Sequence, residues 1–212
     1  MKVLSLFDGI SCGMVALERA GIKVDRYVAY EIDKYAIQAH NAAYPQWADR
    51  NAGDMTKINW KEKPDFDLLT YSTPCQDIST AGKQAGLIEG SDTRSSIIWY
   101  TKHAIQEKKP KYLLGENVKN LVGCNHRPEY FRWLQFLEEE GYTNYYAIIN
   151  AKDCGVPQNR ERVFTVSIHG DHDIYHFPIP IPLELRLKDI LEDEVDDKYV
   201  LSETDYADDV KN

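Results

Sequence analysis

Short apolar runs alternate with helix-forming segments along most of this 212-residue sequence. Six runs have the length and composition of buried strands, at residues 3–7, 26–30, 66–71, 111–115, 144–150 and 163–168. Helical patterns stand between several of them. The alternation predicts an α/β fold, in which a doubly wound, mostly parallel sheet is covered by helices on both faces.

Capping residues mark several helix boundaries. Asp33 is predicted to be the N-cap of a helix that continues through Asn41, because its carboxylate can accept hydrogen bonds from free N–H groups. Gly21 and Gly141 follow two other helical patterns at the position where glycine is favoured. A glycine-bearing loop precedes a further helix that we expect to begin near Ser95.

The composition changes after His176. Residues 177–182 alternate proline with apolar side chains and cannot continue the interior of a sheet. A short amphipathic stretch at 187–191 and an acidic tail follow. We therefore predict one domain over residues 1–176 and a Pro-rich, then acidic connector over 177–212.

Net charge and cysteine spacing limit the class of protein. The formal charge is −9, of which the acidic tail from residue 184 carries about −7, so the rest is nearly neutral. Since phosphate contacts dominate nonspecific affinity for nucleic acid, the chain alone should bind nucleic acid weakly. The four cysteines are far apart, without a C-x-x-C pair, which favours reduced thiols in the cytoplasm over a disulfide framework or a zinc site. No apolar stretch is long enough for a membrane span or a signal peptide.

Polar side chains stand where the predicted strands and their turns end. Ligands bind at the carboxyl ends of the strands in open parallel sheets. The residues concerned are Asp8, Glu31, Asp54, Cys75 and Glu116.

The first of these turns has the residues of a nucleotide-binding loop. Asp8-Gly9 and Gly13 flank it, and Glu31 after the second strand is placed to bind ribose hydroxyls. The loop lacks the G-x-G-x-x-G pattern, which favours S-adenosylmethionine over a dinucleotide. The alternative is an ordinary glycine turn with a strand-capping carboxylate. Asp54 and Met55 would accept the adenine amino group and pack against the ring, or else form a plain turn.

The remaining strand ends carry residues suited to covalent chemistry. Cys75, next to Pro74 in a polar loop, is a candidate nucleophile, whereas Cys12 and Cys154 better suit inert core positions. Glu116 can exchange a proton, or alternatively act as an N-cap or form a salt bridge with a lysine such as Lys119. Arg160 and Arg162 would point the same way in an extended segment and suit phosphate or base-carbonyl recognition, or else occupy a solvated edge strand.

Four ordered motifs resemble the signatures of the DNA cytosine-5 methyltransferases over about residues 1–180. They are Phe7-Asp-Gly-Ile-Ser-Cys-Gly13, Pro74-Cys75-Gln76, Glu116-Asn117-Val118 and Gln158-x-Arg160-x-Arg162. The resemblance implies a catalytic and cofactor-binding domain with the Rossmann-like fold of S-adenosylmethionine-dependent methyltransferases, in a restriction-modification setting. It implies that Cys75 attacks C6 of a cytosine flipped out of DNA, while Glu116 acts at N3 and the two arginines hold the carbonyl.

The same resemblance implies how the cofactor is held. Phe7, Gly9 and Gly13 would lie against S-adenosylmethionine, Glu31 on its ribose, Ile32 beside the adenine and Asp54 on the adenine amino group. The sequence departs from the family pattern at Thr73, where many members have a hydrophobic or small residue, and we expect this to adjust the loop without abolishing it.

The larger departure from the family lies after Lys188, where neither a target-recognition domain nor the closing cofactor motif is found. One hypothesis is an active enzyme whose recognition half comes from a second polypeptide. The second is a truncated form that is inactive alone, and the third is a nonenzymatic binding module. The intact Cys75 and Glu116 favour the first two. An RNA cytosine is chemically conceivable as substrate, but no basic, aromatic-rich RNA surface is evident.

Overall fold

The computed structural model describes residues 1–74 and 97–196. The predicted nucleophile Cys75, the glycine-bearing loop at 82–90 and the helix start near Ser95 lie outside the described residues, as does the tail from residue 197. Contacts divide the chain into two units: Met1–Ile149 with Glu161–Pro178, and Asn150–Arg160 with Ile179–Asn212. The predicted boundary at residue 176 stays a prediction, and each unit is described by itself.

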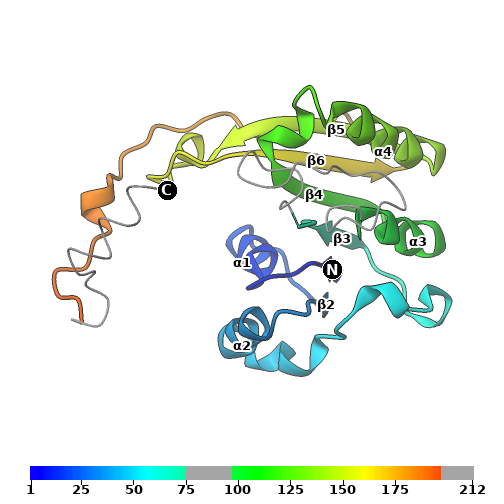
Figure 1. Ribbon diagram of the computed structural model, residues 1–212, viewed down its shortest axis with the longest axis horizontal. Helices are drawn as coiled ribbons and strands as arrows, with labels where there is room; N and C mark the ends of the chain where they lie inside the picture. Colours follow the sequence, from blue (N-terminus) through cyan, green and yellow to red (C-terminus); the bar gives the residue numbers. More distant parts are fainter. Residues whose placement is uncertain (75–96, 197–212) are drawn as a thin grey trace. The chain divides into compact units, whose positions relative to one another are not determined.

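The first unit is built from strands and helices that follow one another along the chain (Figure 1). In order they are β1 (Lys2–Leu6), α1 (Cys12–Arg19), β2 (Arg26–Tyr30), α2 (Lys34–Ala43), the 3-10 helices η1 (Pro45–Arg50), η2 (Met55–Lys57) and η3 (Trp60–Glu62), β3 (Leu68–Tyr71), α3 (Ile98–Lys108), β4 (Tyr112–Val118), η5 (Lys119–Val122), α4 (Arg127–Glu139), β5 (Tyr142–Asn150) and β6 (Glu161–His169). All six predicted strands are present, with small differences at their ends.

The strands form one sheet in the order β2-β1-β3-β4-β6-β5. β2, β1, β3 and β4 are parallel, and β6 is antiparallel to β4. This confirms the mostly parallel α/β sheet. Because the first four strands share a direction, their carboxyl ends meet at one edge of the sheet, where a ligand site is expected.

Apolar cores lie on both faces of the sheet. Successive residues of a strand point to opposite faces, so Val3 packs with Met14 and Leu17 of α1, while Leu4 belongs to the core that contains Trp99 of α3 and Trp133 of α4. Both strand residues are fully buried. Full burial of such a side chain contributes about 1.5–3 kcal/mol, so the two helical layers stabilise the sheet from both sides.

The predicted helix caps are confirmed. The Asp33 carboxylate accepts hydrogen bonds from the N–H groups of Tyr35 and Ala36 at 2.9 and 2.8 Å, at the start of α2. Gly141 has a positive φ of 92° directly after α4, a conformation that glycine adopts without steric cost. No described helix meets the length and apolar character of a membrane span.

β4 extends beyond the strand predicted at 111–115. It continues through Val118 because β6 pairs with its last residues, matching Glu116 with Phe164 and Val118 with Arg162. β3 ends earlier, where Tyr71 is paired with Gly115. The expectation that Glu116 follows the strand end was therefore wrong: Glu116 lies inside β4, beyond the end of β3.

The second unit contains two short 3-10 helices, η6 (Ala151–Cys154) and η7 (Leu187–Asp189). The Ile181 N–H donates to the Asp153 carbonyl at 2.9 Å and ties its two segments together. Cys154 is exposed, as is Cys12 in the first unit. The assignment of these two cysteines to inert core positions was therefore wrong, because Cys12 at the start of α1 and Cys154 at the end of η6 both face solvent.

Candidate active site

The loop after β1 is held in an unusual backbone conformation. Phe7, Gly9 and Ser11 all have positive φ, at 59°, 57° and 67°. For the two side-chain-bearing residues this conformation costs free energy and must be imposed by the surroundings. The Phe7 N–H donates to the Tyr30 carbonyl at 2.9 Å, so the first residue of the loop is still hydrogen-bonded to the end of β2.

The Glu31 carboxylate fastens this loop to the end of β2. One oxygen accepts from the Gly9 N–H at 2.9 Å, and the other accepts from the N–H groups of Ile32 and Asp33 at 2.7 and 2.9 Å. The Ile32 side chain is 76% exposed. The space where a Cβ of Gly9 would stand is open. A carboxylate, an exposed apolar side chain and bare backbone therefore adjoin one another at this sheet edge.

The Asp54 segment is linked to Glu31 by a residue that the sequence analysis did not select. The Asn51 side chain accepts from the N–H groups of Glu31 and Gly53, both at 3.1 Å. The Asp54 carboxylate accepts from the Thr56 N–H at 2.9 Å and hydroxyl at 2.7 Å, and these bonds lower its pKa. The sequence signal for Asn51 was its position two residues before Gly53. Its side chain joins the backbone of the two segments that carry Glu31 and Asp54.

Met55 and Asp8 are turned into the protein. Met55 is 5% exposed and packs in the core that contains Trp60. The Asp8 carboxylate is 2% exposed and accepts from the Ser5 hydroxyl at 2.6 Å, and also from the hydroxyls of Ser11 and Tyr27. Asp8 therefore stabilises the loop conformation from its buried side.

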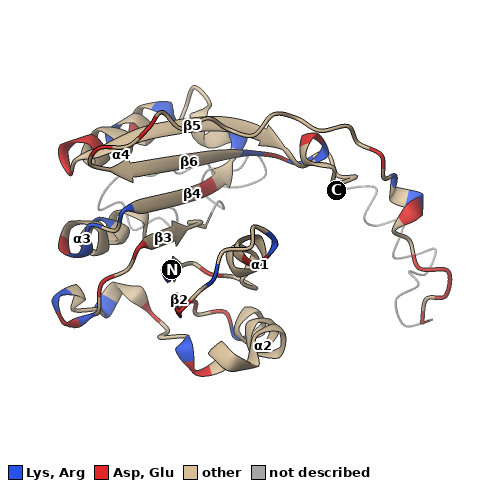
Figure 2. Cartoon of the chain, turned by 180° about the vertical axis from the view of Figure 1, so that it is seen from behind, with Lys and Arg blue, Asp and Glu red and all other residues tan. Residues whose placement is uncertain are grey.

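Two predicted catalytic residues lie together where β4 and β6 pair. The Arg162 Nε lies 3.1 Å from one Glu116 oxygen, and the Ser72 hydroxyl donates to the other at 2.5 Å. Figure 2 shows acidic and basic residues meeting at these ends of β4 and β6. Lys119 pairs instead with Glu161 at 2.8 Å, so the alternative of a Glu116–Lys119 salt bridge was wrong.

Asn117 anchors the chain that leads to the predicted nucleophile. Its amide nitrogen donates to the Thr73 carbonyl at 3.2 Å and to the Thr73 hydroxyl at 3.0 Å. Its oxygen accepts from the Val118 N–H at 2.8 Å. Asn117 and Thr73 are 6% and 4% exposed. The residue at which the sequence departs from the family pattern is thus hydrogen-bonded twice to β4, two positions before Cys75.

Arg160 belongs to the second unit, whereas Arg162 belongs to the first. Its N–H donates to the Asn150 side chain at 3.0 Å, and its carbonyl accepts from the Ala151 N–H at 3.0 Å. Its side chain is exposed. Its expected orientation alongside Arg162 stays a prediction.

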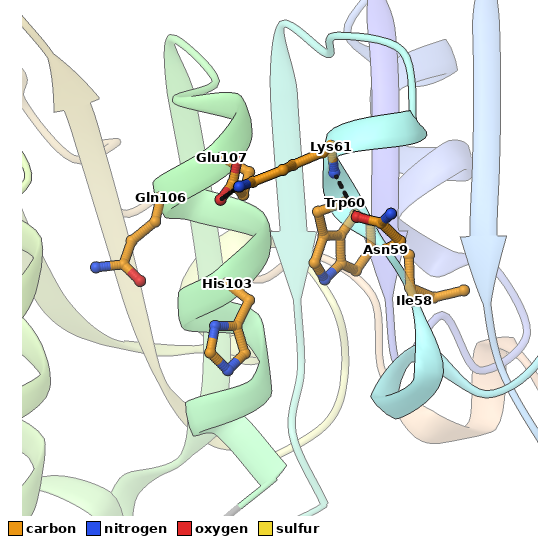
Figure 3. Close-up of a pocket in the computed structure, with 7 residues that line it drawn as sticks. All are labelled: Ile58, Asn59, Trp60, Lys61, His103, Gln106 and Glu107. Atoms are coloured by element: carbon orange, nitrogen blue, oxygen red, sulfur yellow. Dashed lines mark hydrogen bonds and ion pairs between the residues drawn. The ribbon is translucent and has the colours of Figure 1, made fainter.

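A separate hollow lies between η3 and α3 and contains none of the predicted residues (Figure 3). Its volume is about 190 Å³, and Lys61 and Glu107 face each other across it at 3.9 Å. η3 precedes β3 in the chain, so this hollow is on the amino-terminal side of that strand. The candidate active site is therefore the opposite, carboxyl edge of the sheet.

The fold is the Rossmann-like fold found in methyltransferases. Among solved structures, the chain resembles the S. pombe Dnmt2 methyltransferase, with a TM-score of 0.73 and 21% identity over 96% of this chain and 63% of that one. It also resembles the Entamoeba histolytica methyltransferase EhMeth, with a TM-score of 0.76 and 18% identity over 95% and 63%.

Sequence comparison gives the family. The model of the C-5 cytosine-specific DNA methylases matches residues 1–212, and the chain belongs to this family. It is 50% identical over 160 residues to the type II methyltransferase M2.ScrFI of Lactococcus lactis subsp. cremoris, covering 76% of this chain and 44% of the relative. It is 38% identical over 206 residues to the type II methyltransferase M.SsoII of Shigella sonnei, covering 95% and 52%. The chain spans about half the length of these relatives.

Proposed function

We propose that this chain is the catalytic region of a DNA cytosine-C5 methyltransferase that uses S-adenosylmethionine and forms a covalent intermediate through Cys75. The observation that carries the proposal is the Glu116–Arg162 pair at the carboxyl edge of the sheet, beside the anchored segment that leads to Cys75. The type II methyltransferase names of its relatives support a restriction-modification role.

The residues around the first loop fit S-adenosylmethionine. Exposed Ile32 offers an apolar surface for adenine, and the Glu31 oxygen that accepts from Gly9 retains one lone pair for a ribose hydroxyl next to it. The open backbone at Gly9 admits close approach, with Phe7 and Gly13 flanking it. When bound, this cofactor supplies an electrophilic methyl group to C5 of cytosine. Asp54, held by Thr56 beside buried Met55, would accept from the adenine amino group.

The protein residues would prepare cytosine C5 for that transfer. The Cys75 thiolate would add to C6, which makes C5 electron-rich. Glu116 would hold N3 and its proton while negative charge develops on the ring. The Nε of Arg162 contacts Glu116, which leaves other N–H groups of the guanidinium free of this contact. These N–H groups would bind the base carbonyl with support from Arg160. Loss of the C5 proton and departure of the thiolate from C6 would complete the reaction.

DNA is the proposed substrate, and the target base must leave the duplex before Cys75 can reach it. The nearly neutral main part of the chain offers little phosphate attraction. We therefore propose that DNA affinity and target choice come from further residues, in a second polypeptide or a continuation of the same one. The reactive thiol requires a reducing compartment, which suits the cytoplasm.

The test is transfer of a radiolabelled methyl group from S-adenosylmethionine to mixed bacterial DNA. Wild-type protein is compared with Cys75→Ser and with Cys124→Ser, a matched control at an exposed cysteine outside the site. Label should enter DNA with the wild type and the control, and Cys75→Ser should abolish it.

Cofactor binding measured by calorimetry separates two ways of failing. Binding without transfer would mean that this region needs its recognition partner. The absence of both cofactor binding and methyl transfer would refute the proposal for this chain. Equal incorporation by Cys75→Ser would refute the covalent mechanism.

A further inference from the structure

A buried pair of ionisable side chains lies beneath the first loop, and the proposed reaction does not use it. His40 of α2 places its Nδ1 3.5 Å from an Asp8 carboxylate oxygen. The two side chains are 3% and 2% exposed. A carboxylate taken out of water is costly unless it is hydrogen-bonded and paired with a cation, so the protonation state of His40 matters.

The hydrogen bonds on Asp8 fit an ionised carboxylate. One oxygen accepts from Ser5, at 2.6 Å, and from Tyr27, while the other accepts from Ser11. The Ser5 hydroxyl in turn accepts from Thr70 at 3.0 Å, which fixes the direction of its own proton toward Asp8. Three hydroxyl donors converge on a group that itself donates nothing.

With Asp8 ionised, the bonds on His40 fit a ring that carries protons on both nitrogens. The Ser11 hydroxyl has one proton and gives it to Asp8, so it can only accept from His40 Nδ1. His40 Nε2 faces the Trp47 carbonyl at 3.4 Å, and a carbonyl can only accept. A histidine that donates from both nitrogens is an imidazolium cation.

The other ionisable groups around His40 do not supply a competing charge. Tyr27 stacks on the ring at 5.9 Å, and burial with the Asp8 charge raises the pKa of its phenol. The Tyr44 ring centroid lies 6.0 Å from that of His40. Burial raises the pKa of Tyr44, and the hydrogen bond that it donates to Glu18 raises it further. Both phenols are therefore neutral at ordinary pH, and Asp8 is the anion that His40 contacts.

The pair controls the conformation of the loop through Ser11. Ser11 has no exposed surface, so its hydroxyl cannot act as a nucleophile, and its φ of 67° must be imposed by its contacts. Its N–H donates to the Asp8 carbonyl at 3.0 Å, and its carbonyl accepts from Met14 at 3.0 Å where α1 begins. The contacts of Ser11 thus join the loop, α1 and α2.

We propose that His40 is a positioning residue: as a cation it neutralises Asp8 and, through Ser11, holds the loop at Phe7–Gly13 in the shape that receives the cofactor. The inference rests on the proposed function for the identity of that cofactor. The charge state of His40 does not depend on it.

The first experiment is nitrogen-15 NMR of the histidine side chains in the full chain at neutral pH. The signals of His40 are assigned by their loss in His40→Gln. Two protonated ring nitrogens are expected. One protonated and one bare nitrogen would overturn the proposal, whether or not the protein binds S-adenosylmethionine.

The second experiment measures S-adenosylmethionine binding by calorimetry, well below the unfolding temperature. His40→Gln leaves Asp8 buried without its cation and should weaken binding about tenfold or more. Asp8→Asn combined with His40→Gln removes the need for a cation and should recover most of that loss. His103→Gln, at an exposed position on α3, is the matched control and should bind as the wild type does.

Unchanged binding by His40→Gln, or a double variant no better than the single one, would overturn the positioning role. If His40→Gln does not fold, recovery of folding and binding in the double variant still tests the charge pairing. Absence of cofactor binding by the wild type would instead refute the proposed function, and the NMR result would still decide the charge state.

Discussion

Gly115→Ala is expected to destabilise the protein because a side chain already fills the space. Tyr71 is paired with Gly115 across β3 and β4, and its ring lies over the glycine. A Cβ at residue 115 would stand 2.7 Å from Tyr71 Cζ and 2.8 Å from its hydroxyl oxygen. The ring is 5% exposed and packs edge-on against Trp133, whose Nε1 donates to the hydroxyl at 3.1 Å.

The size of the effect follows from these contacts. Overpacking a dense core costs about 1–3 kcal/mol. Displacing the hydroxyl would also leave the buried Trp133 N–H without its acceptor, at about 1–3 kcal/mol. A total of roughly 2–6 kcal/mol lowers the unfolding temperature by about 4–24 °C in a protein of this length.

Thermal unfolding followed by circular dichroism measures the shift. Gly13→Ala is the matched control, because its Cβ would meet only Thr70 Oγ1 at 3.9 Å, an ordinary contact. Replacing Tyr71 with leucine in the Gly115→Ala background should return part of the loss. A Gly115→Ala protein that unfolds within about 1 °C of the parent would refute the reasoning, since that is less than 1 kcal/mol would produce.

Three further predictions concern single contacts. Asp33→Ala should cost about 1 kcal/mol through loss of the α2 cap, and unchanged amide hydrogen exchange in α2 would contradict this. Burial raises the Tyr71 pKa to about 12, so its neutral phenol stabilises the fold fully below pH 10 and this contribution is lost as pH rises through 12. Alkaline unfolding compared with Tyr71→Phe checks the sign, because the variant should lose less stability over that range. Thr73→Val removes the hydroxyl that accepts from Asn117 and should slow methyl transfer about tenfold, whereas Thr73→Ser keeps this hydrogen bond and the rate. Equal rates for the two variants would contradict a role for this hydrogen bond.

Local patterns predicted those parts of the fold that depend on neighbouring residues. The strand at Arg26–Tyr30 and the cap at Asp33 were predicted from composition and spacing alone, because apolar runs and capping side chains act over a few residues. The end of β4 was not, since Glu116–Val118 is held in the sheet by β6, a strand far along the chain.

The candidate site shows the same division. Motif order identified Glu116 and Arg162, and the structure brings them together. Sequence reasoning missed Asn51 and His40, because an asparagine in a turn and a histidine in a helix are common on protein surfaces. Their importance comes from a buried partner on another element, which no local pattern encodes.

β4 extends three residues beyond the end of β3, from Glu116 to Val118, and this extension affects how the chain can vary during evolution. Side chains alternate along β4, so Asn117 is buried while its neighbours Glu116 and Val118 are partly exposed on the other face. A single-residue deletion within β4 would exchange these faces, turning the carboxylate toward the core and the amide away from Thr73. Apolar substitutions at Val118 are therefore expected to be tolerated at this edge, whereas insertions and deletions of odd length are expected to be removed by selection.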